Sequence, residues 1–95
     1  MIEIISSTQA KMLMEQGAQL IDVRSESEFE QGAAPGAKNF PIKKLSKQVQ
    51  DLDAKKPVIV YCRTGGRSAE AEKFLKGIGF THVHNAGSIY NYLSD

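Results

Sequence analysis

The chain has 95 residues, 41% of them hydrophobic, which is enough for one small core and too little for two. We therefore expect a single domain over residues 1–95. The 12 Lys and Arg residues nearly balance the 11 Asp and Glu residues, so the formal charge of +1 gives no overall field to attract nucleic acid or a membrane. One cysteine excludes an internal disulfide and any metal site built on several thiolates, and we expect no metal and no cofactor.

The beginning of the chain bears on location. Residues 1–5 lack the basic segment and the long apolar segment of a secretory signal peptide. No run of apolar residues is long enough to cross a membrane. We therefore expect a cytoplasmic protein, and note that a mature chain whose signal had been removed would look the same.

Helical and strand-like patterns alternate through the first half of the chain. Ser7 or Thr8 is expected to cap a helix that continues through Glu15, and residues 19–23 form a strand. A capping box of Ser25 with a Glu three positions later predicts a second, short helix. This helix should end at the glycine that precedes a turn rich in Ala, Pro and Gly.

The same alternation continues to the end of the chain. In order, the patterns predict a short strand within 39–42, a helix at 42–52, a strand at 57–61, a helix from 68 to 75, a strand at 81–84 and a last helical turn at 89–93. The run Val58–Tyr61 is apolar without alternation, as in a strand covered on both faces of a parallel sheet. These patterns indicate an α/β domain with this run as its central strand.

The only cysteine comes directly after that strand. Cys62 is followed by Arg63, Thr64, Gly65, Gly66, Arg67 and Ser68, where the next helix is expected to begin. Ligands of open parallel sheets bind beyond the carboxyl ends of the strands, and a loop entering a helix there aims several N–H groups at one point. We expect Gly65 and Gly66 to let the loop curl around a sulfur or an oxyanion, and the two arginines to offer forked donors to an anion.

The setting of Cys62 favours a reactive thiolate. A thiol at its reference pKa is only about 3% ionised at neutral pH, and a helix N-terminus with two guanidiniums raises that fraction. Such a thiolate can attack a sulfane sulfur, hold it as a persulfide and pass it on. A lone cysteine is more often a small buried hydrophobe, but that role would need neither the paired glycines nor the paired arginines around it.

Residues 62–68 resemble the active-site loop of the rhodanese family, whose members form a persulfide on this cysteine. The segment from Leu20 to Ile42 is similar to the first signature of the family. The segment from Val83 to Tyr92 is similar to its closing segment. The resemblance covers nearly the whole chain and implies a mostly parallel, five-stranded sheet flanked by helices on both faces.

Three residues depart from the family pattern. Ala33 stands where His is usual, Ser88 replaces the second closing glycine, and Tyr92 stands where Trp is usual. None of the three lies in the cysteine loop. The departures therefore affect the pocket wall and the partner surface rather than the chemistry.

The resemblance implies a thiosulfate sulfurtransferase. A sulfane sulfur would move from thiosulfate or a persulfide donor, through a Cys62 persulfide, to cyanide or a thiol acceptor, including a thiol on a partner protein. Cys62 is then the catalytic residue, and the substrate-binding residues are Arg63, Thr64, Gly65, Gly66, Arg67 and Ser68. Because the chain has one cysteine, the persulfide must be discharged to an outside acceptor.

Two alternatives belong to other functional classes. A Cys-dependent phosphatase or arsenate reductase also uses a cysteine-led anion loop, but only four residues separate Cys62 from Arg67, fewer than in the phosphatase signature. A non-catalytic interaction domain on the same fold is the other alternative, although such domains usually lose the cysteine or the loop arginines. Asp22 and Arg24, just past a predicted strand, are expected to form a structural ion pair rather than to act in catalysis.

Overall fold

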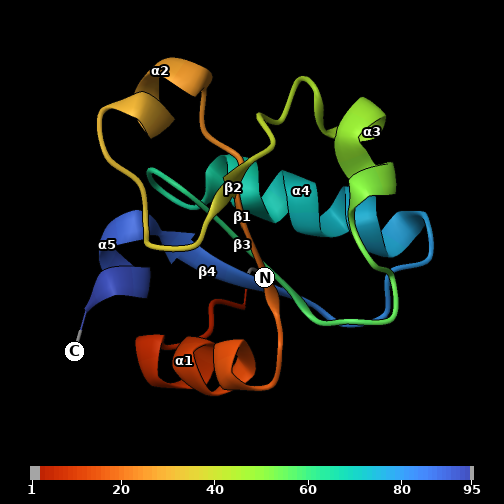
Figure 1. The fold of residues 1–95 in the computed structure, drawn as a ribbon, viewed down its shortest axis with the longest axis horizontal. Coiled ribbons are helices and arrows are strands. Elements are labelled where there is room, and N and C mark those ends of the chain that lie inside the picture. Colours follow the sequence, from red (N-terminus) through yellow and green to blue (C-terminus); the bar gives the residue numbers. More distant parts are fainter. Residues whose placement is uncertain (1–2, 95) are drawn as a thin grey trace.

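The computed structural model describes residues 3–94 and shows one parallel sheet with the strand order β2-β1-β3-β4 (Figure 1). The strands are Gln19–Asp22 (β1), Lys38–Asn39 (β2), Val58–Cys62 (β3) and Val83–Ser88 (β4). The helices are Ser7–Glu15 (α1), Glu26–Glu30 (α2), Leu45–Gln48 (α3), the 3-10 helix Val49–Asp51 (η1), Gly66–Gly77 (α4) and Ile89–Leu93 (α5). Within the described residues, no helix is long and apolar enough to span a membrane.

The sheet divides the interior into two cores. Along β3, Val58, Val60 and Cys62 face the core that contains Leu45 of α3 and Leu75 of α4. The alternate residues of β3, Ile59 and Tyr61, face the core that contains Ala10 of α1 and Ile89 of α5. Figure 1 shows α1 and α4 on opposite sides of the sheet. The continuous apolar run in β3 therefore follows from its need to fill both cores.

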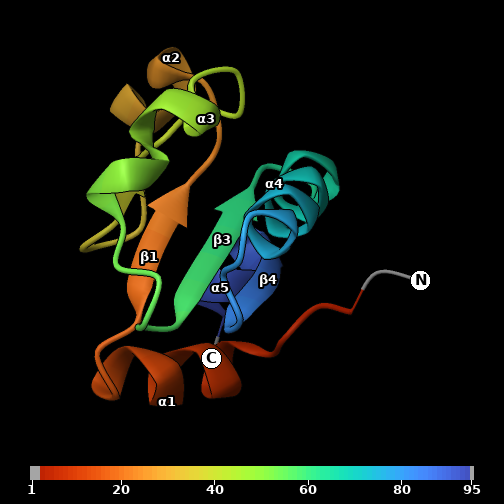
Figure 2. The same ribbon diagram turned by 90° about the vertical axis from the view of Figure 1, so that its right-hand side faces the viewer.

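Strand β3 lies between β1 and β4, and all five of its residues are buried. Figure 2 shows β1 and β3 side by side and pointing in the same direction. On the other edge of β3, Val60 is opposite Asn85, whereas Cys62 is opposite Ser88, so β4 contains an extra residue in this interval. Such a bulge bends the strand and changes its local twist. Here the bulge lies directly beside the cysteine.

The α/β class and the parallel sheet confirm the prediction, but the number of strands differs. Residues 3–94 form four strands rather than five. The described segment before α1 is held to the sheet by a hydrogen bond from Ile5 N–H to the carbonyl of Asn85, 2.9 Å long, without forming a strand.

Several element boundaries also differ from the prediction. The short strand is Lys38–Asn39 rather than within residues 39–42, and the central strand is shifted by one residue, to Val58–Cys62. The last strand extends to Ser88 instead of ending at His84, because β3 supplies backbone partners that residue types do not reveal. The helix expected from Ile42 begins only at Leu45, since residues 41–44 form a turn closed by the Lys44 N–H and the Pro41 carbonyl, 2.7 Å apart. The helix after the cysteine starts at Gly66, earlier than the predicted Ser68.

The helix caps show both a success and an error. The capping box of Ser25 and Glu28 is present: Ser25 Oγ accepts a hydrogen bond from Glu28 N–H, 3.2 Å long, and Glu28 Oε1 accepts one from Ser25 N–H. The cap of α1 is Ser6 rather than Ser7 or Thr8, because Ser6 Oγ accepts a 3.1 Å hydrogen bond from Gln9 N–H. Ser7 is instead buried.

Candidate active site

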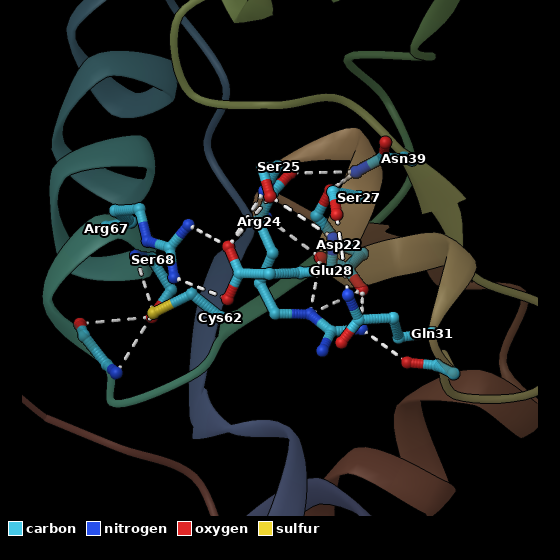
Figure 3. A network of polar contacts seen from close by, with 12 residues as sticks. Asp22, Arg24, Ser25, Ser27, Glu28, Gln31, Asn39, Cys62, Arg67 and Ser68 are labelled. Atoms are coloured by element: carbon cyan, nitrogen blue, oxygen red, sulfur yellow. Dashed lines mark hydrogen bonds and ion pairs between the residues drawn. The ribbon is translucent and has the colours of Figure 1, made fainter.

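Cys62 is the last residue of the central strand and lies at its carboxyl end. Its side chain is fully buried in the core beneath α4. The sulfur accepts hydrogen bonds from Gly65 N–H at 2.9 Å and from Ser68 N–H at 3.4 Å, and Ser68 Oγ lies 3.5 Å away (Figure 3). The loop therefore directs hydrogen-bond donors at the sulfur of Cys62, the residue that the sequence predicts to be the nucleophile.

These contacts decide the ionisation of the thiol. Burial raises the pKa of Cys62 because the thiolate loses water. Hydrogen bonds from the Ser68 hydroxyl and from the backbone N–H groups of Ser68, Gly65 and Thr64 lower the pKa by more, since they favour the charged form. The resulting pKa lies below the ordinary thiol value. More of the sulfur is therefore the nucleophilic thiolate at neutral pH.

The two loop glycines have different conformations, which corrects the expectation that both act as pivots. Gly65 has φ of 101°, in the left-handed region that favours glycine. Gly66 is the first residue of α4, and its φ is not positive. Of the two glycines, only Gly65 thus needs to be glycine for its backbone conformation, and its N–H donates a 2.9 Å hydrogen bond to Cys62 Sγ.

Alanine at the two glycine positions is expected to change the free energy of unfolding by different amounts. Gly65→Ala should lower the free energy of unfolding by about 1–2 kcal/mol, because the left-handed region is strained for alanine. Gly66→Ala should leave it unchanged or raise it by up to about 1 kcal/mol, because a Cβ there meets no atom within 4 Å and helix formation favours alanine. Urea unfolding of both variants tests this, and equal losses would contradict the assignment.

Arg67 is oriented differently from the sequence-based expectation of a free anion-binding fork. Its Nη1 and Nη2 donate to Glu28 Oε1 and Oε2 at 2.7 and 3.1 Å, joining α4 to α2 (Figure 3). The guanidinium lowers the pKa of Glu28 to about 2, so the carboxylate stays charged at neutral pH. The fork of Arg67 is therefore already used by a carboxylate of the chain itself. In the sequence, Glu28 is identifiable as a helix-capping residue and lies within the first family signature, but neither feature predicts its pairing with Arg67.

Arg63 and Thr64, the other two loop residues, are exposed. Arg63 borders a cavity of about 510 Å³. The remaining residues around this cavity are Arg24, Glu28, Gln31, Gly32, Ala33, Ile89, Tyr90 and Leu93. Arg67 borders a separate cavity of about 330 Å³, together with Lys43 and Lys44. Arg63 and Arg67 thus line different cavities on the surface.

The predicted ion pair of Asp22 and Arg24 is confirmed. Both residues are buried, and Arg24 Nη2 lies 2.7 Å from Asp22 Oδ2. Arg24 Nη2 also donates to the carbonyl of Gly32 at 2.7 Å, and the guanidinium lies over the ring of Tyr61, 5.7 Å from its centre. The pair therefore fixes the segment after α2 next to the end of β1.

The three residues that depart from the family pattern have separate structural roles. Tyr92 stacks on Tyr61 with ring centres 5.8 Å apart, so it fills the second core. Ser88 caps α5, because its Oγ accepts a 3.0 Å hydrogen bond from Asn91 N–H. Ala33 borders the 510 Å³ cavity. Of the three, only Ala33 lies on the wall beside Arg63.

The comparisons with known proteins agree with this geometry. The rhodanese-like domain family matches residues 6–94. The chain is 41% identical over 68 residues to the uncharacterized protein YqhL of Bacillus subtilis, a match that covers 72% of this chain and 54% of YqhL. The chain thus spans about half the length of that relative.

Two further relatives carry an activity in their names. Over 71 residues the chain is 37% identical to the thiosulfate sulfurtransferase PspE of Escherichia coli, covering 73% of this chain and 68% of PspE. Over 81 residues it is 35% identical to the thiosulfate sulfurtransferase GlpE of Pseudomonas syringae, covering 85% of this chain and 76% of GlpE.

Solved structures show the same fold. A rhodanese with anions from E. coli superposes with a TM-score of 0.77 at 32% identity, covering 83% of this chain and 95% of the other. The human single-domain sulfurtransferase TSTD1 superposes with a TM-score of 0.78 at 27% identity, covering 94% and 92%. The cysteine loop, the parallel sheet and the match over residues 6–94 together establish that the chain belongs to the rhodanese-like domain family.

Proposed function

We propose that the protein is a sulfurtransferase of the thiosulfate sulfurtransferase type, with Cys62 as its nucleophile. The observation that carries this proposal is the set of hydrogen bonds on Cys62 Sγ, from Gly65 N–H at 2.9 Å and Ser68 N–H at 3.4 Å. The names of PspE and GlpE, and the membership in the rhodanese-like family, support the same activity.

In the first step, the Cys62 thiolate attacks the outer sulfur of thiosulfate. A new S–S bond forms, the sulfur–sulfur bond of thiosulfate breaks, and sulfite leaves with the electron pair of that bond. The product is a Cys62 persulfide with its negative charge on the terminal sulfur. A persulfide donor reacts in the same way, with a thiolate as the leaving group. The N–H groups of the loop stabilise the charge on sulfur throughout the step.

In the second step, an outside acceptor takes the terminal sulfur. Cyanide forms a carbon–sulfur bond with it, the S–S bond to Cys62 breaks, and the electron pair returns to Cys62 as the thiolate. A thiolate acceptor, free or on a partner protein, would instead leave as a hydropersulfide anion. Cys62 is the only cysteine of the chain, so no second thiol of this chain can intercept the persulfide.

An anionic donor agrees with the charges near the loop. Arg63 is exposed and borders the 510 Å³ cavity, whereas Glu28, on the same cavity, is neutralised by Arg67. The N-terminus of α4, a helix of 12 residues, adds a partial positive charge behind the sulfur. We assign Arg63 and the backbone of residues 64–68 to donor binding. Arg67 contributes indirectly by fixing α4 against α2.

The loop supports sulfur rather than phosphate as the transferred group. Its N–H groups contact Cys62 Sγ itself at 2.9 and 3.4 Å, so the loop closes around one sulfur atom. A phosphatase needs a ring of donors wide enough to enclose a tetrahedral phosphate beyond the nucleophile. The pairing of Arg67 with Glu28 also removes the guanidinium that such a ring would use.

The experiment is to incubate the purified protein with thiosulfate, remove the excess and measure the intact mass. We expect an addition of about 32 Da, one sulfur atom, on Cys62. Cyanide should then release thiocyanate and restore the original mass. Absence of the adduct would overturn the proposal, and hydrolysis of a phosphate ester at a comparable rate would support the phosphatase instead.

A further inference from the structure

Asn85 is a buried polar residue that the proposed chemistry does not use. It lies on β4 opposite Val60 and is 1% exposed. Its Oδ1 accepts a 2.8 Å hydrogen bond from Gly87 N–H, whereas its Nδ2 has no hydrogen-bond partner among the described residues. Burying an unpaired amide nitrogen costs stability, so an apolar side chain would suit this core position better unless Oδ1 has a specific task.

The hydrogen bond from Gly87 N–H to Asn85 Oδ1 stabilises an unusual backbone conformation at Gly87. This residue has φ of 75° and lies in the interval where β4 contains its extra residue. An Asn side chain that accepts the N–H two residues ahead forms an Asx turn, which fixes the backbone of the residues between. Asn85 therefore holds the bulge of β4 in one conformation.

Gly87 in turn lies against the cysteine loop. A Cβ added to Gly65 would be 3.6 Å from Gly87 Cα, so the two backbones are in near contact. Ser68 Oγ lies 3.5 Å from the Gly87 carbonyl oxygen and 3.0 Å from the Gly65 carbonyl oxygen, so it sits between the two segments. Gly65 and Ser68 each donate a backbone N–H hydrogen bond to Cys62 Sγ.

We propose that Asn85 is a positioning residue that holds Gly87 and, through it, keeps the N–H groups of Gly65 and Ser68 on Cys62 Sγ. The catalytic value of this positioning rests on the proposed function, whereas the contacts of Asn85 described above do not. Asn85 is not among the hydrogen-bond partners of Cys62 Sγ in the described residues. Asn85 acts on Cys62 indirectly, through the backbone of Gly87 in β4 and the backbone of the loop between β3 and α4.

The test measures the ionisation of Cys62 directly, through the ultraviolet absorbance of the thiolate as a function of pH. Cys62 is the only cysteine, and the same titration of a variant carrying Cys62→Ser gives the background. Asn85→Ala should raise the pKa of Cys62 by about half a unit to one unit, because the loop N–H groups move off the thiolate. Asn85→Ser should raise it less, since a serine hydroxyl can bond Gly87 N–H more weakly.

Asn91→Ala is the matched control. Asn91, in α5, donates from Nδ2 to the Ala86 carbonyl of β4 at 2.7 Å and to the Ile5 carbonyl at 3.0 Å. Within residues 3–94, no hydrogen bond joins its side chain to residues 62–68. We expect this variant to unfold at lower urea concentration with an unchanged Cys62 pKa. An equal pKa rise in both alanine variants would show general loosening of β4 and overturn the proposal.

An unchanged Cys62 pKa in Asn85→Ala would also overturn the proposal. If Asn85→Ala does not fold, Asn85→Ser decides: a folded protein with an unshifted pKa contradicts it, and a raised pKa supports it. The titration uses no sulfur donor. Failure of sulfur transfer would therefore count against the proposed function alone, and an unshifted titration would count against the role of Asn85 alone.

Discussion

Replacement of Cys62 by serine is expected to abolish sulfur transfer while leaving the domain folded. The serine hydroxyl is not ionised at neutral pH and cannot form a persulfide, so the rate should fall by a factor on the order of a thousand or more. Serine is close to cysteine in size and can accept the hydrogen bond from Gly65 N–H that Sγ now receives. We expect a loss in the free energy of unfolding of about 1–2 kcal/mol.

Intact mass after thiosulfate treatment and urea unfolding of the same sample separate the two effects. The variant should show no sulfur adduct and a cooperative unfolding transition. Residual transfer would mean that another group carries the sulfur. Loss of the fold would mean that Cys62 acts chiefly as a small buried hydrophobe. Its full burial is consistent with that alternative, so the unfolding measurement is needed to test it.

Removal of the charge on Asp22 is expected to have the largest effect on stability. Asp22→Asn leaves the guanidinium of Arg24 buried without its partner, a change that typically costs about 3–5 kcal/mol. Asp22 Oδ1 also accepts a 2.8 Å hydrogen bond from Arg24 N–H. A small domain has only about 5–15 kcal/mol in total, so the variant should be close to unfolded at moderate urea concentration.

Glu26→Gln provides the matched control for Asp22→Asn. Both substitutions replace one carboxylate by its amide, but Glu26 pairs with Lys44 on the surface, where the two side chains are 64% and 56% exposed. Exposed pairs contribute less than about 1 kcal/mol, so the unfolding midpoint should barely change. Equal losses in the two variants, measured by urea denaturation, would show that burial does not distinguish these ion pairs.

The sequence predicted the features that depend on neighbouring residues. The unbroken apolar run Val58–Tyr61 requires a strand buried on both faces, and that strand is β3. The Ser25 capping box places the start of α2, since both partners lie within one helical turn. Cys62 and the helix after it follow from the same local pattern. These features can be predicted without knowing which distant segments of the chain they contact.

The remaining features depend on contacts between distant segments. Arg67 and Glu28 are 39 positions apart, so no local pattern predicts that the Arg67 guanidinium pairs with the Glu28 carboxylate. Nor does a local pattern show that Arg63, unlike Arg67, is exposed. The extension of β4 to Ser88 depends on pairing with β3, and the bulge that carries Gly87 arises within that pairing. The family resemblance included Asn85 and Gly87 but assigned no role to either. That role depends on where the cysteine loop lies in space.

The complete burial of β3 has a consequence for local motion. Backbone amides of a central strand that is buried along its length exchange with solvent only through large-scale opening of the domain, whereas exposed loop residues exchange through small fluctuations. The sulfur atom is therefore carried by the part of the chain that opens least often. Arg63 and Thr64 are exposed on the adjoining loop and can move without displacing the sulfur. Under the proposed function, this loop would adapt to donors of different size while Cys62 Sγ keeps its position.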